Sequence, residues 1–284
     1  MMKIFKKVLK IIGIISLALF IGLYCLFYWG TSPKSDEKVF DTFIEAGIIP
    51  KIYKEVYKNF DYRKVSIVKD TTLPTVVFVH GTIGSVLDFS AYITDSLLSK
   101  NANFITYDRI GYNYEEENKV QESIAFERDM LEDIIKNLNP QKTILVGYSY
   151  GGPIALASYK KYRKVILFAP AVYSKVEPMP WMLNLYNWKL TRWMIPPIWK
   201  QASKEKLTHR QDLEKFEQKW NQNPNQIVSI HGNEDWIVPF DNSKYLQSQF
   251  PKSQFELITI DGAGHGLIWS NFEEIKSQLL KHLD

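Results

Sequence analysis

Short apolar segments of two kinds alternate along most of this chain, and the alternation constrains the fold more than any other feature. The first kind are β-branched or aromatic runs typical of buried strands, at 65–68, 75–79, 104–107, 143–146, 165–168, 227–230 and 255–260. The second kind repeat their apolar residues at helical spacing, at 88–99, 120–138, 153–162 and 272–283. Strands that alternate with helices predict an α/β fold, with a mostly parallel central sheet and helices on both of its faces.

One long interval interrupts the alternation. The 55 residues between Pro170 and Gln226 are too many for a plain crossover between neighbouring strands, and they hold five of the eight tryptophans. We expect a helical cap inserted at about 171–226, with helices near 181–194 and 207–221.

The N-terminal segment predicts a membrane anchor. Residues 11–29 carry no charge, and a helix of that length, at about 1.5 Å per residue, matches the apolar thickness of a bilayer. Lysines precede this run, so we expect residues 1–30 to cross the cell membrane once, with a cytoplasmic N-terminus and the remaining chain outside. A cleaved signal peptide, which would leave a secreted protein, is the alternative.

The region between this anchor and the sheet is less regular. Residues 31–38 are polar, and apolar pairs at helical spacing follow from Val39 to Tyr57. We therefore expect a linker and amphipathic helices at 31–62 and a main domain at 63–284.

Charge and cysteine content exclude several classes of function. The formal charge of +4 equals the contribution of the four lysines before residue 11, so the rest of the chain is neutral and does not resemble a nucleic-acid-binding protein. The only cysteine, Cys25, lies inside the apolar run, so residues 31–284 hold no disulfide and no thiol nucleophile. No metal-ligand spacing and no phosphate-loop pattern is present, so we expect no metal and no cofactor.

Ser149 is the strongest candidate for a catalytic residue. It occupies the centre of Gly147-Tyr-Ser-Tyr-Gly151, between the strand at 143–146 and the helix at 153–162. A serine hydroxyl becomes a nucleophile when a base takes its proton, and a tight glycine-flanked turn exposes its oxygen. A flexible turn without catalytic function is the alternative.

Residues that could activate such a serine follow later strands. His265 comes after 255–260 and is the candidate base, while Asp235 comes after 227–230 and is the candidate acid that orients the imidazole. Nearby Glu234, Asp241 and Asp261 are weaker candidates for the acid. An oxyanion would need two backbone N–H donors, which we assign to Tyr150 and Thr82, with Ile83 as the alternative to Thr82.

The runs VFVHGTIGS, FITYDRIGY, VGYSYGG, IHGNEDWIVP and GAGHGL resemble the α/β-hydrolase superfamily over roughly 65–284. The resemblance is greatest to lidded esterase, lipase and peptidase-like members. It implies a triad of Ser149, His265 and Asp235, which stand in the chain order Ser, Asp, His of that superfamily. A serine at the nucleophile position argues against the dehalogenase and epoxide hydrolase members.

Three functional hypotheses follow. The first is a serine esterase that forms an acyl-enzyme with a small-molecule or lipid ester, bound in an apolar acyl pocket beneath the cap. The second is an aminopeptidase-like amide hydrolase, in which acids of the cap would hold the substrate amine. The candidates for that role are Glu205, Asp212, Glu214 and Glu217. The third is a binding module that has lost catalysis.

Overall fold

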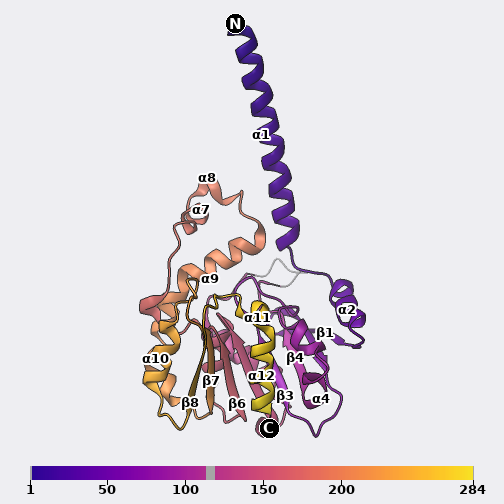
Figure 1. Ribbon diagram of the computed structural model, residues 1–284, viewed down its shortest axis with the longest axis vertical. Coiled ribbons are helices and arrows are strands. Elements are labelled where there is room, and N and C mark those ends of the chain that lie inside the picture. The colour runs from indigo at the N-terminus through magenta and orange to yellow at the C-terminus, as the bar shows by residue number, and fades with distance from the viewer. Residues whose placement is uncertain (1, 113–118, 284) are drawn as a thin grey trace. The chain divides into compact units, whose positions relative to one another are not determined.

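The computed structural model describes residues 2–112 and 119–283, which belong to two compact units, 1–33 and 34–284. The first unit is essentially one helix, α1 (Met2–Thr31) (Figure 1). Its stretch Ile4–Thr31 is long and apolar enough to cross a membrane, and none of it is buried. A helix of this kind near the N-terminus is compatible with either a single-pass anchor or a signal sequence.

The second unit is built on one eight-stranded sheet with the order β1-β2-β4-β3-β5-β6-β7-β8. The strands are β1 (Lys51–Tyr57), β2 (Phe60–Ile67), β3 (Thr75–Val79), β4 (Asn103–Tyr107), β5 (Thr143–Tyr148), β6 (Lys164–Phe168), β7 (Ile227–Gly232) and β8 (Phe255–Ile260). The six strands from β3 to β8 are parallel, and β2 pairs antiparallel with both β1 and β4. The predicted mostly parallel sheet is therefore confirmed.

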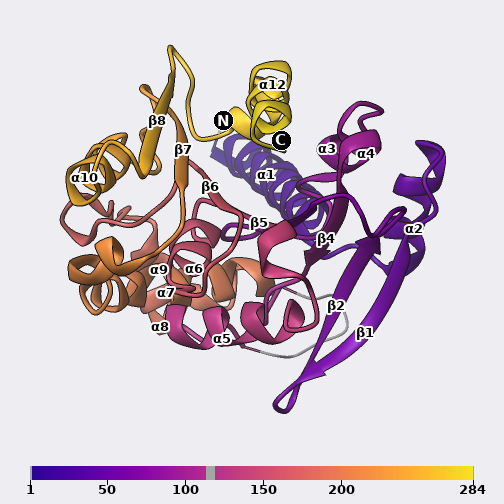
Figure 2. The ribbon, with the colours of Figure 1, turned by 90° about the horizontal axis from the view of Figure 1, so that it is seen from below.

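Both faces of the sheet are buried, which explains the continuous apolar runs of its strands. In β3, Val76 and Phe78 pack into one apolar cluster while Val77 and Val79 pack into another, because successive side chains point to opposite faces. Helices α3 (Ser90–Thr94), α4 (Leu98–Asn101) and α12 (Phe272–Leu283) cover the first face. Helices α5 (Ile124–Ile134), α6 (Gly151–Leu156) and α10 (Asp241–Gln249) cover the second. Figure 2 shows the two sets on opposite sides of the strands.

Helices were expected throughout 39–57, but residues 51–57 form a strand. Helix α2 spans Asp36–Glu45, but β1 then pairs with β2 along its whole length, from Lys51 opposite Ser66 to Tyr57 opposite Phe60. A tight turn at Lys58, where φ is +54°, joins the two strands. Since β2 also pairs with β4, this hairpin belongs to the main sheet, and the second compact unit begins at Lys34 and not near residue 63.

Several predicted helices are shorter than their apolar patterns. The pattern at 88–99 divides into α3 and α4, because Asp95 between them has an extended backbone with ψ of 131°. The pattern at 120–138 contains α5 alone. This helix begins after Ser123, whose hydroxyl accepts a hydrogen bond from the Phe126 N–H and caps the first turn.

The inserted cap lies between β6 and β7, as expected, but its helices have different bounds. They are η2 (Ser174–Val176), α7 (Leu183–Asn187), α8 (Lys189–Arg192), α9 (Pro197–Glu214) and η3 (Glu217–Gln222). The longest of them, α9, starts with a proline at its first position, where the missing N–H costs nothing. The pattern at 181–194 corresponds to the two short helices α7 and α8.

Candidate active site

Ser149 lies on a tight turn directly after β5 and before α6. Its φ is +54°, which is uncommon for a residue with a side chain. The flanking glycines allow this turn, because a Cβ at Gly147 would lie 2.3 Å from the Gly151 carbonyl oxygen and one at Gly151 would lie 2.1 Å from that of Val79. The turn is therefore closely packed, which disagrees with the alternative of a flexible connection.

Ser149, His265 and Asp235 form a chain of hydrogen bonds. Ser149 Oγ lies 3.0 Å from Nε2 of His265, and Nδ1 of His265 lies 2.7 Å from Oδ2 of Asp235. An ionised carboxylate only accepts hydrogen bonds, so the imidazole proton belongs on Nδ1. The lone pair of Nε2 is then directed at the serine hydroxyl. The structure thus brings together three residues that the sequence motifs selected separately.

Asp235 is buried, and its surroundings favour the ionised form. Burial alone would raise the pKa of its carboxyl. Hydrogen bonds from His231 and His265, the charge of His265 and the Val238 N–H outweigh the burial and hold this pKa well below its usual value. Oδ1 accepts from the N–H groups of Ile237 at 2.9 Å and Val238 at 2.8 Å. Asp235 is therefore kept ionised, and its carboxylate is held in one orientation.

The weaker acid candidates lie outside this hydrogen-bond chain. Glu234 is exposed beside Asp235. Asp261 accepts a hydrogen bond from the Asn233 amide at 2.9 Å, and Asp241 pairs with Lys244 at 3.1 Å.

Two residues beside the Ser149–His265–Asp235 hydrogen bonds were given no functional role from the sequence. Tyr148 donates a hydrogen bond from its hydroxyl to the His265 backbone carbonyl at 2.9 Å, and its ring stacks on the imidazole with centroids 5.1 Å apart. His231 places Nε2 2.9 Å from the Val238 carbonyl and 3.3 Å from Asp235 Oδ2. Their positions in the sequence could have indicated them, because Tyr148 is next to Ser149 and His231 comes four residues before Asp235.

The loop after β3 runs against the serine turn. A Cβ at Gly81 would lie 2.8 Å from Cβ of Ser149. The Gly81 carbonyl lies 2.7 Å from Nδ1 of His80 and 3.3 Å from Nη1 of Arg109. A trans peptide directs its C=O and N–H in opposite directions, so the Thr82 N–H points away from those two groups. Within residues 2–112 and 119–283, the backbone N–H groups of Thr82 and Tyr150 donate to no backbone carbonyl.

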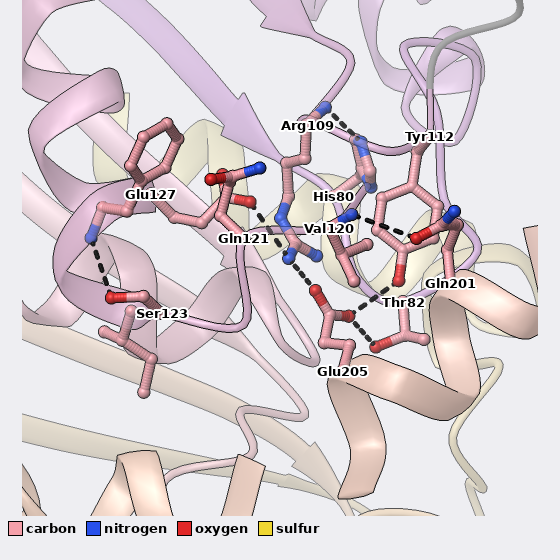
Figure 3. Close-up of polar contacts among 12 residues, drawn as sticks. His80, Thr82, Arg109, Tyr112, Val120, Gln121, Ser123, Glu127, Gln201 and Glu205 are labelled. Carbon is pink, nitrogen blue, oxygen red and sulfur yellow. Dashed lines mark hydrogen bonds and ion pairs between the residues drawn. The ribbon is translucent and has the colours of Figure 1, made fainter. Parts of the chain in front are cut away.

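A buried polar cluster joins the same loop to the cap (Figure 3). Glu205 on α9 accepts hydrogen bonds from the Thr82 hydroxyl at 2.7 Å and the Tyr112 hydroxyl at 2.8 Å, and it pairs with Arg109. Arg109 also lies 3.5 Å from the buried carboxylate of Glu127. These contacts bind the cap helix to the residues that border Ser149.

His80 belongs to this cluster as a neutral residue. Its Nε2 accepts the Arg109 N–H at 2.9 Å, so its proton is on Nδ1, which donates to the Gly81 carbonyl. Burial and the charge of Arg109 lower the pKa of His80 to about 3, so it carries no charge at neutral pH.

The acids of the cap that could hold a substrate amine have other partners or lie at the surface. Glu205 is bound as described above. Asp212 accepts the Ile124 N–H and pairs with Lys215 at 3.0 Å, while Glu217 accepts the Ser174 N–H at 3.0 Å. Glu214 is exposed. In the part of the chain that the structure describes, no group of three His, Cys, Asp or Glu side chains is arranged to hold a metal ion.

Comparison with known proteins agrees with this architecture. Residues 74–170 match the family model described as alpha/beta hydrolase fold. A candidate lipase from Acinetobacter baumannii is similar over 88% of this chain and 96% of its own, with a TM-score of 0.67 and 15% identity. A candidate aryl esterase from Burkholderia cenocepacia is similar over 81% and 97%, with a TM-score of 0.65 and 14% identity.

A third solved structure, a membrane phospholipase A described as a bacterial virulence factor, is similar over 96% of this chain and 97% of its own. Its TM-score is 0.62 and its identity 12%. At such identities the structural likeness establishes the fold. Together with the parallel sheet, the turn at Ser149 and the matching family model, it shows that this chain has the α/β-hydrolase fold.

Proposed function

We propose that this protein is a serine hydrolase that cleaves carboxylic esters. The observation that carries the proposal is the hydrogen-bond chain from Ser149 Oγ through His265 to Asp235, which starts at a backbone turn with positive φ. This arrangement supplies a nucleophile, a base and a group that orients the base.

The reaction would proceed in two halves. Ser149 Oγ attacks the ester carbonyl while Nε2 of His265 takes the hydroxyl proton, and Asp235 stabilises the imidazolium that forms. His265 then returns the proton to the leaving alcohol. A water molecule, activated by the same imidazole, hydrolyses the acyl-enzyme and restores Ser149.

The backbone N–H groups of Tyr150 and Thr82 are the proposed donors to the oxyanion. Tyr150 follows Ser149 at the start of α6, and Thr82 lies in the loop that contacts Ser149. The fixed orientation of the Gly81 carbonyl supports Thr82 over Ile83, since it sets the direction of the Thr82 N–H. Donors that are held in place before the reaction stabilise the developing charge most effectively.

The partners of the cap acids favour esters over substrates with a free amine. An aminopeptidase-like site needs an unpaired carboxylate near the nucleophile, but Glu205, which contacts the loop after β3, already binds Arg109, Tyr112 and Thr82. The lipase, esterase and phospholipase described above lend further support to ester cleavage. An apolar acyl substrate, in particular a lipid ester, would suit a chain that also carries an apolar N-terminal helix.

We also propose that α1 is an uncleaved anchor. The lysines before its apolar run favour a cytoplasmic N-terminus, with the hydrolase unit on the outer side of the membrane. A secreted enzyme released by signal cleavage is the alternative. The molecular mass of the mature protein in the membrane fraction would distinguish them, because cleavage removes about 3 kDa of chain, at a mean residue mass near 0.11 kDa over residues 1–30.

Hydrolysis of matched esters and amides tests the reaction class. The full chain in detergent would be given p-nitrophenyl esters of increasing acyl length, the corresponding p-nitroanilides and aminoacyl anilides. We expect ester hydrolysis that depends on acyl length and that His265→Gln abolishes. Faster cleavage of aminoacyl anilides would support the aminopeptidase-like reading, and ester hydrolysis that survives His265→Gln would contradict the mechanism.

A further inference from the structure

The part of the cap from Met179 to Lys200, which ends in the first turn of α9, exposes large apolar side chains. We call residues 179–200 the cap tip. Leu190 is 88% exposed, Trp181 and Trp193 are each 71% exposed, and Trp188 is 59% exposed. Single exposed apolar residues are common on proteins, but a continuous segment of them marks a surface that binds a partner.

These side chains are not the hydrophobic core of the cap. Leu190 lies in α8, and the three tryptophans lie before, between and after α7 and α8, neither of which has a buried residue. The buried tryptophan of the cap is Trp220 in η3, which packs on the sheet-facing side with Phe216. Figure 1 shows α7 and α8 on the far side of α9 from the sheet. The tip therefore faces away from the folded core of its own unit.

The charges of the cap tip are all of one sign. The tip contains Lys189, Arg192 and Lys200 and no aspartate or glutamate. The Arg192 guanidinium donates only to backbone carbonyls, of Tyr186 at 2.6 Å and Asn187 at 3.1 Å, so no carboxylate in the described structure cancels its charge. Tryptophans beside basic residues, in a segment with no acid, are typical of segments that lie in the headgroup region of a membrane.

A membrane suits this surface better than a second copy of the chain. Two copies that met through their cap tips would bring like charges together, because a two-fold interface uses the same patch on both subunits. An anionic lipid surface instead attracts lysine and arginine side chains. Only Ser32 and Pro33 separate α1 from the second unit, so a bilayer that holds α1 keeps that unit at its surface.

We propose that the cap tip docks on an anionic lipid bilayer, with Trp181, Trp188 and Trp193 in the headgroup region and the basic side chains toward lipid phosphates. The docking surface is separate from Ser149 and does not depend on the proposed reaction. It is a second attachment of the protein to the membrane, in addition to α1.

Site-specific fluorescence in the full chain tests this contact. In a Cys25→Ser background, an environment-sensitive fluorophore would be attached at Trp188→Cys or, as a control, at Lys252→Cys, an exposed position before β8. The proteins would be reconstituted into phosphatidylcholine vesicles with and without phosphatidylglycerol. We expect blue-shifted emission at position 188, quenching by brominated lipid and a larger effect with phosphatidylglycerol, while position 252 keeps the emission of an aqueous probe.

Two further variants make the outcome decisive. Lys189→Gln combined with Arg192→Gln should weaken the dependence on phosphatidylglycerol, and Ser149→Ala should leave the docking signal unchanged because no catalysis is involved. The proposal would be overturned if the fluorophore at position 188 had the same emission spectrum as the fluorophore at position 252. A blue shift without quenching by brominated lipid would also overturn it, because a second copy or another protein surface would then cover the tip.

Discussion

Glu205 of the cap helix α9 lies 2.7 Å from the hydroxyl of Thr82, the residue whose N–H is a proposed oxyanion donor. The two residues are 123 positions apart in the chain. Both carboxylate oxygens of Glu205 are engaged, one by Arg109 and the other by Thr82 and Tyr112. Glu205 therefore joins the cap to the loop after β3 by a hydrogen bond to Thr82, and to Arg109, which follows β4, by a buried ion pair.

Replacing Glu205 should destabilise the fold strongly. Glu205→Ala leaves Arg109 without its closest carboxylate in a buried environment, and breaking a buried ion pair in this way costs about 3–5 kcal/mol. Thr82→Val removes one neutral partner of the same carboxylate and keeps the backbone N–H, so its cost should be nearer 1 kcal/mol. Thermal unfolding of both variants in detergent checks the order, and equal melting temperatures for Glu205→Ala and the wild type would contradict it.

Tyr148 should support the position of His265 by two separable contacts. Tyr148→Phe removes the hydrogen bond to the His265 carbonyl and keeps the stacked ring, which we expect to lower kcat/KM for an ester by up to tenfold, the equivalent of about 1.4 kcal/mol. Tyr148→Ala removes both contacts and should cost more. Steady-state kinetics of the two variants test this account, and identical kcat/KM values for Tyr148→Phe and Tyr148→Ala would show that the ring contributes nothing.

Glu127 should make the protein less stable as the pH rises. Burial raises its pKa to about 7, the charge of Arg109 opposes this effect, and the charge of Glu205 adds to it. Between its ordinary value of 4.5 and about 7, the folded state keeps a proton that the unfolded state releases. The contribution of Glu127 to stability is therefore fullest below pH 4.5 and falls as the pH rises through that window.

Glu127→Gln tests this dependence, because the amide resembles the protonated acid in shape and has no charge. Between pH 5 and pH 7.5, at matched ionic strength, the melting temperature of the wild type should fall more than that of the variant. The same decrease in both proteins would mean that Glu127 stays ionised across this range.

The sequence predicted the sheet well because buried parallel strands carry a strong local signal. The bounds of β3 and β8 agree with the prediction to the residue. The β1–β2 hairpin was missed, because apolar pairs such as Ile52-Tyr53 also occur on helices and because pairing with β2, not local preference, determines the structure. The spacing of apolar residues does not predict where a helix ends, because a break such as the one at Asp95 depends on the backbone angles of a single residue.

The candidate site shows the same division between local and long-range information. Ser149, Asp235 and His265 each follow a strand in a recognisable motif, and parallel strands bring their carboxyl ends to one edge of the sheet. Glu205 was noticed only as a possible amine ligand, since nothing near it in the sequence indicates Arg109, Tyr112 or Thr82. Its contacts arise from the way α9 folds back over the domain.

Labelling with a fluorophosphonate probe tests the central claim most directly, because the probe reacts only with a serine that a neighbouring base activates. The full-length wild type, Ser149→Ala and the control Ser248→Ala, which changes an exposed serine of α10, would be compared at equal concentration. We predict that the wild type and Ser248→Ala are labelled and that Ser149→Ala is not. Labelling that persists in Ser149→Ala, or a folded wild type that does not react, would contradict the assignment of Ser149 as an activated nucleophile.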